Sequence, residues 1–175
     1  FWAGELSDVA STALLGTVSS ISGFIIVVLA PILGAMADFT GKKKVFLMTF
    51  ALIGILSTSF LFFIPYANWQ WSLIIFGLSV IGFSGANIFY DSLLLDVSSN
   101  EDRNFVSSLG YALGYLGGGI LFLINVLMYL YPSFFGLSSQ AEGILYSFLS
   151  VALWWLIFSM PIFLYVKQKN HQVSK

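Results

Sequence analysis

The chain has 175 residues, of which 58% are hydrophobic and only 9% are charged, whereas about a quarter of an ordinary soluble domain is charged. So few charges cannot cover the surface of a globule of this size, which excludes a water-soluble fold. The net charge is −1 and the seven basic residues are scattered among three loops, so no basic face for nucleic acid exists. With no cysteine and a single histidine, His171 in a polar tail, the chain offers no disulfide and no metal-ligand set, and we expect no cofactor.

Five apolar stretches follow one another along the chain, at residues 13–37, 45–64, 71–95, 105–131 and 143–166. A helix rises about 1.5 Å per residue, so stretches of about 20 residues can each cross about 30 Å of hydrocarbon. Strands of a membrane barrel would alternate in polarity over about ten residues, and these stretches do not alternate. The predicted fold class is therefore all-α: a polytopic transmembrane helix bundle with five spans and a polar tail at 167–175.

The connections between these spans are short and carry local signals of their own. Ser99, followed by Asp102, has the spacing of a helix N-cap with an acid in the first turn. This pattern predicts that the fourth span starts near residues 100–104. The chain begins with Phe1, and its first dozen residues lack the basic start and apolar run of a signal peptide, so we expect it to be truncated at its beginning.

The basic residues predict how the bundle is oriented. Lys and Arg in short loops remain on the cytoplasmic side of a membrane. All the basic residues follow the first, third or fifth span, whereas the opposite ends carry acids only. We therefore expect the basic loops and the tail to be cytoplasmic. The residues concerned are Lys42, Lys43, Lys44, Arg103, Lys167, Lys169 and Lys175.

The third span carries a polar face. Ser84, Asn87 and Asp91 follow Gly77 at spacings of 7, 3 and 4 residues, with Tyr90 beside them. An ionised Asp at the centre of a bilayer costs about 2.5–3.5 kcal/mol on insertion scales, so a membrane carboxylate usually faces a cavity or a partner. Two interpretations of Asp91 stay open. In the first it lines a cavity or takes part in ion coupling, and in the second it bonds a neighbouring helix and stabilises the bundle.

Small residues recur at helical spacing in the first and fourth spans, most regularly at Gly110, Gly114 and Gly118. Such faces let helix backbones approach closely in lipid, so we expect both spans to pack against protein. The second and fifth spans are rich in Phe and Trp, and we expect them to face lipid.

The connection after the first span resembles the signature loop between the second and third helices of major facilitator superfamily transporters. Gly34, Asp38, Gly41, Lys42 and Lys43 keep the spacing of that loop, although Phe39 stands where a base is usual. Gly34 and Gly41 would permit a tight turn, and Asp38 can pair with lysines. The resemblance implies that the five spans match helices two to six of that fold. Residues 1–175 would then be a partial N-terminal transmembrane domain whose partner is the missing C-terminal half.

A narrower resemblance covers residues 87–125. There NIFYDSLLLDV is followed by Arg103 and by VSSLGYALGYLGGG, which resembles the autophagy-related vacuolar amino-acid effluxers and their bacterial relatives. It implies a secondary active transporter that moves a small solute, by analogy an amino acid, by alternating access with proton coupling. The membrane would be the cytoplasmic membrane of a bacterium or the vacuolar membrane of a fungus.

This resemblance assigns three groups of residues. The pathway for substrate or protons would be lined by Ser84, Asn87, Tyr90, Asp91 and Asn125. The loop from Gly34 to Lys43 would gate access, with Asp38 and Lys42 as a cytoplasmic latch. The glycines of the fourth span would let the two halves slide.

The alternative function is a non-transporting membrane scaffold or a decayed half of a transporter. The chain contains no HExxH, GxSxG or phosphate-loop pattern, so we do not expect an enzyme.

Overall fold

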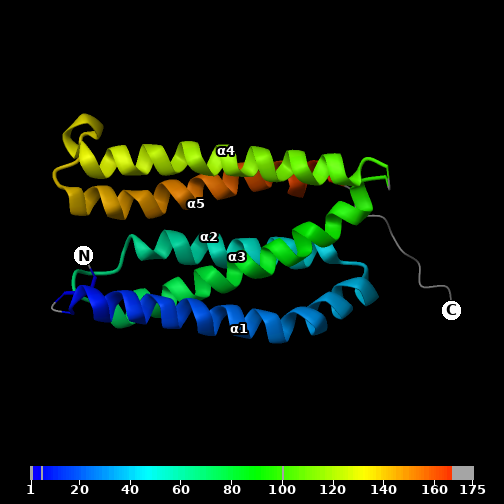
Figure 1. Ribbon diagram of the computed structural model, residues 1–175, viewed down its shortest axis with the longest axis horizontal. Helices are drawn as coiled ribbons and strands as arrows, with labels where there is room; N and C mark the ends of the chain where they lie inside the picture. Colours follow the sequence, from blue (N-terminus) through cyan, green and yellow to red (C-terminus); the bar gives the residue numbers. More distant parts are fainter. Residues whose placement is uncertain (1, 5, 100, 167–175) are drawn as a thin grey trace.

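The computed structural model describes residues 2–4, 6–99 and 101–166 and is built from long helices (Figure 1). The helices are α1 (Asp8–Thr40), α2 (Lys43–Leu61), α3 (Trp69–Val97), α4 (Arg103–Leu130) and α5 (Gln140–Tyr165), with a short 3-10 helix η1 (Pro132–Phe135) before α5. Within the described residues, five helices are long and apolar enough to cross a membrane, which confirms the predicted all-α class with five spans. The predicted polar tail, with its three lysines and His171, lies outside the described residues.

Serines that bond nearby backbone amides lie at the start of α1 and just before α4. The Ser7 hydroxyl accepts a hydrogen bond from the Ala10 amide at 3.2 Å, so α1 begins at Asp8, earlier than predicted. The Ser99 hydroxyl accepts from the Asp102 amide at 3.1 Å and donates to the Asp102 carboxylate at 2.8 Å. The helix α4 begins at Arg103, within the predicted range 100–104. The predicted cap is wrong, because the N-cap residue is Asp102, which makes no capping bond with its side chain, and Ser99 lies before it.

The helices lie in two layers (Figure 1). One layer holds α1, α2 and α3, and the other holds α4 and α5. Within the first layer α3 packs on both α2 and α1, and the layers are joined mainly where α2 packs on α5. Because α3 and α4 make little contact, the region between them is left as a groove.

The closest helix contact is the crossing of α2 and α3. A Cβ built on Gly82 would lie 2.6 Å from the Gly54 Cα and 2.9 Å from the Phe50 carbonyl oxygen, so a side chain has no room there. Below the crossing, Phe89 is 1% exposed and its ring centroid lies 5.2 Å from that of Phe46. The expectation that the second span faces lipid is therefore wrong for the face that carries Gly54. Small residues on this face let the backbones of α2 and α3 come close together, although the span as a whole is rich in bulky residues.

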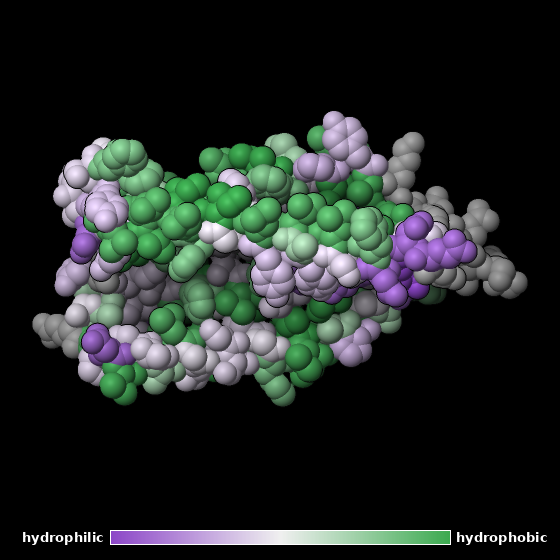
Figure 2. Space-filling model, turned by 45° about the horizontal axis from the view of Figure 1, so that its top comes forward, coloured by the Kyte–Doolittle hydropathy of each residue, from purple (hydrophilic) through white to green (hydrophobic). Residues whose placement is uncertain are grey.

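The two ends of the bundle differ from its middle. Figure 2 shows strongly hydrophilic residues gathered at the two ends, with mainly hydrophobic residues between them. The α1–α2 and α3–α4 connections lie at the same end as the end of α5, so Lys42, Lys43, Lys44 and Arg103 share that end (Figure 1). Their placement on the cytoplasmic side stays a prediction.

Candidate functional site

A groove of about 500 Å³ lies between α3 and α4. It forms because these helices make little contact and because two α4 positions facing it are glycines. Figure 2 shows the molecule hollowed between its two layers. The lining residues are Phe83, Asn87, Tyr90 and Asp91 from α3, and Gly110, Tyr111, Gly114 and Tyr115 from α4.

Asp91 supplies the one acidic side chain among the described residues that line this groove. It is exposed and lies about 9 Å from the end of α3, at about 1.5 Å per residue. The Tyr111 hydroxyl donates to its Oδ1 at 3.5 Å, the long limit for a hydrogen bond. A carboxylate with such a loose partner can accept a proton or a cationic group.

The structure brings three of the predicted pathway residues together and leaves two apart. Asn87, Tyr90 and Asp91 line the groove. Asn125 instead accepts a hydrogen bond from the Ser150 hydroxyl at 2.7 Å, where α4 meets α5.

Ser84 is half-buried and does not line the groove either. Gly77, the first residue of the predicted polar face, packs on α1, because a Cβ built on it would lie 3.0 Å from Val18 and 3.2 Å from Ser22.

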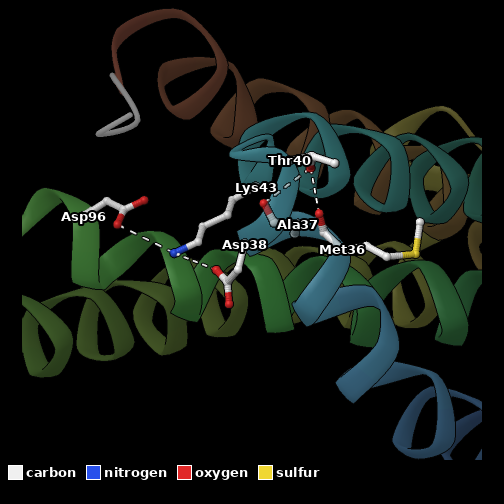
Figure 3. A network of polar contacts seen from close by, with 6 residues as sticks. All are labelled: Met36, Ala37, Asp38, Thr40, Lys43 and Asp96. Carbon is white, nitrogen blue, oxygen red and sulfur yellow. Dashed lines mark hydrogen bonds and ion pairs between the residues drawn. The ribbon is translucent and has the colours of Figure 1, made fainter. Parts of the chain in front are cut away.

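A second polar cluster joins α1, α2 and α3 at the end that carries the basic loops (Figure 3). The Lys43 Nζ lies 3.2 Å from the Asp38 Oδ1 and 3.6 Å from the Asp96 Oδ1. Lys43 and Asp96 are buried, whereas the side chain of Asp38 is 67% exposed. Asp38 thus pairs with a lysine, Lys43, and the cytoplasmic latch of Asp38 and Lys42 stays a prediction.

Of the two glycines predicted to permit a tight turn after the first span, only Gly41 lies in the turn. Gly41 has a φ of 62°, the left-handed conformation that ends α1, and its amide donates to the Asp38 carbonyl at 3.3 Å. Gly34 lies within α1 and takes no part in the turn, because the helix continues to Thr40. After the turn, the Lys44 Nζ donates to the Val166 carbonyl at 2.9 Å and ties α2 to the end of α5.

Comparison with known proteins places these features in a family. The protein family described as "Vacuole effluxer Atg22 like" matches residues 2–101 and 95–175, which together cover nearly the whole chain. The chain belongs to this family. The resemblance predicted from the loop after the first span and from residues 87–125 is thereby confirmed.

Two curated relatives of this Atg22-like chain come from bacteria. It is 41% identical over 174 residues to the "Uncharacterized MFS-type transporter YxiO" of Bacillus subtilis (strain 168), covering 95% of the chain and 39% of that protein. It is 37% identical over 95 residues to an "Uncharacterized protein" of Aquifex aeolicus (strain VF5), covering 53% of the chain and 23% of that protein. The chain thus spans less than half the length of these relatives, and no solved structure matches it.

The glycines of α4 are largely uncovered in this Atg22-like chain. A Cβ built on Gly110 would lie 3.3 Å from the Tyr90 hydroxyl, whereas one built on Gly114 or Gly118 meets no atom within 4 Å. The described residues therefore do not supply the close helix packing predicted at Gly114 and Gly118, which stays a prediction.

Three residues of these sites were not singled out from the sequence. Tyr111 and Tyr115 were visible in the repeat GYALGY, but only its glycines were interpreted. Asp96 closes the segment DSLLLD, and its burial shows only when α2 and α3 are packed together. Among the described residues no group of three His, Cys, Asp or Glu side chains could hold a metal ion.

Proposed function

We propose that this chain forms part of a secondary active transporter that moves a small solute across a membrane by alternating access. The observation that carries the proposal is an exposed carboxylate, Asp91, on the groove side of a membrane-spanning helix. A carboxylate at this depth is costly to insert into lipid, and such residues mark solute or ion pathways. The family description names an effluxer, and the Bacillus relative is named an MFS-type transporter, which supports the same activity.

In this proposal the groove between α3 and α4 forms part of the solute pathway. Asp91 takes up and releases the coupled proton, and Asn87 with the tyrosine hydroxyls hydrogen-bonds the solute. An amino acid is the first candidate solute, because residues 87–125 resemble the vacuolar amino-acid effluxers. The Asp38–Lys43–Asp96 cluster holds one access state at the end of the bundle with the basic loops.

The test is transport by the full-length protein in proteoliposomes, with radiolabelled amino acids and an imposed pH gradient. Asp91→Asn is expected to lower proton-driven transport by about tenfold or more, equivalent to about 1.4 kcal/mol. Asp8→Asn is the matched control, because Asp8 is an exposed carboxylate in the first turn of α1, at the opposite end of the bundle.

Unchanged transport by Asp91→Asn at every pH would refute the role of this carboxylate. If no solute is transported and none raises the melting temperature of the purified protein, the result favours the non-transporting scaffold.

A further inference from the structure

We propose that the groove between α3 and α4 binds an organic cation, such as an alkylammonium group, through Asp91 and the rings of Tyr90, Tyr111 and Tyr115. The proposal names the class of solute for the groove, and it rests on the proposed function only in that the bound cation is then transported. The argument has three parts: charge, aromatic faces and space.

The charge of the groove favours a cation. Its described lining residues include one carboxylate and no Lys, Arg or His. Lys43, at the start of the neighbouring helix α2, is not among the lining residues and lies 3.2 Å from Asp38 and 3.6 Å from Asp96. The hydrogen bond from Tyr111 to Asp91 is at its long limit of 3.5 Å, which leaves the carboxylate able to accept a stronger donor. In a region of low dielectric constant such a carboxylate attracts a positive group strongly.

Three tyrosines from the two helices line the same groove as this carboxylate. Tyr90 precedes Asp91 on α3, while Tyr111 and Tyr115 lie one turn apart on α4. The three residues are 43%, 55% and 81% exposed, so their rings border the open groove and are not packed into the core. Aromatic faces attract cations through the ring quadrupole, and they attract a neutral group of the same shape much less.

The space beside the rings suits a molecule larger than a metal ion. Gly110 and Gly114 immediately precede the two α4 tyrosines, and a Cβ on Gly114 would meet nothing within 4 Å. The groove volume of about 500 Å³ lies in the usual range for small-molecule sites. Divalent cations favour several carboxylate and carbonyl oxygens, and the described residues hold no cluster of three metal-ligating side chains. An organic cation therefore fits the groove best.

The test measures binding of choline to the purified full-length protein by isothermal titration calorimetry. The matched probe is 3,3-dimethyl-1-butanol, which has the shape of choline but no charge. Saturable choline binding, about tenfold or more tighter than binding of the neutral probe, is the expected result. Equal binding of the two probes, or binding of neither, would overturn the proposal.

Variants assign the binding to the groove. Asp91→Asn is expected to weaken choline binding by about tenfold, and Tyr115→Leu by about fivefold. Tyr115→Phe keeps the ring and should bind choline more tightly than Tyr115→Leu does, whereas Asp8→Asn at the far end of α1 should bind it as the wild type does. Should Asp91→Asn elute as an aggregate in size-exclusion chromatography, the Leu and Phe variants at the exposed Tyr115 decide the question.

Wild-type choline affinity in Tyr115→Leu would refute the aromatic contribution. The two proposals fail separately: choline binding without transport of any solute contradicts the transport function alone. Transport of neutral solutes without choline binding contradicts the cation site alone.

Discussion

Asp38 and Asp96 both contact the ammonium group of Lys43, but Asp96 is buried and Asp38 is exposed. Replacing each by Asn removes the same charge, so the difference in stability loss measures the effect of burial. The side chain of Asp96 is 3% exposed, and removing one partner of a buried ion pair costs about 3–5 kcal/mol. Asp38 still lies 3.2 Å from the ammonium, so we expect Asp96→Asn to cost about 3 kcal/mol. The side chain of Asp38 is 67% exposed, and Asp38→Asn should cost about 0–1 kcal/mol.

The assay is thermal unfolding of the purified full-length protein, followed by tryptophan fluorescence. Since the melting-temperature shift scales with the change in unfolding free energy, Asp96→Asn should lower the melting temperature at least about threefold more than Asp38→Asn does. The double variant Lys43→Met/Asp96→Asn removes both buried charges and should be closer to the wild type than Asp96→Asn alone. Equal shifts for the two Asn variants, or a larger one for Asp38→Asn, would refute the reasoning.

Three further predictions concern the packing and the turn. Gly82→Ala should destabilise the protein by about 1–3 kcal/mol, because its Cβ would lie 2.6 Å from the Gly54 Cα. Gly16→Ala, in an open part of α1, should be neutral, and thermal unfolding of the two variants measures the difference. Ser150→Ala removes the 2.7 Å hydrogen bond to Asn125 and should cost about 0.6 kcal/mol in a denaturant titration, and a cost above about 2 kcal/mol would show a larger network. Gly41→Ala forces a φ of 62° on an alanine and should cost about 1 kcal/mol, while Gly41→Asn should cost less. Equal melting temperatures of the wild type and the Ala variant would contradict this backbone strain.

Much of the candidate site could be predicted from the third span alone. The spacing of Asn87, Tyr90 and Asp91 puts them near one another on a helix whatever that helix packs against, and the structure places all three in the groove. Asn125 lies on another helix, and its direction depends on how α4 rotates against α5, where it meets Ser150. The residue pattern of a single helix does not predict how that helix is rotated against its neighbour.

The sequence by itself determined the five spans, the start of α4 near Arg103 and the turn at Gly41. Lipid offers no hydrogen bonds, so a long apolar segment must satisfy its own backbone as a helix, and caps and turns depend on residues a few positions apart. Only the tertiary structure decided that Gly54 and Gly82 make the closest crossing while Gly114 and Gly118 stay open. The tertiary structure also decided that Lys43 pairs with Asp96. This ion pair depends on how α2 and α3 pack together, and the sequence of neither helix alone specifies that packing.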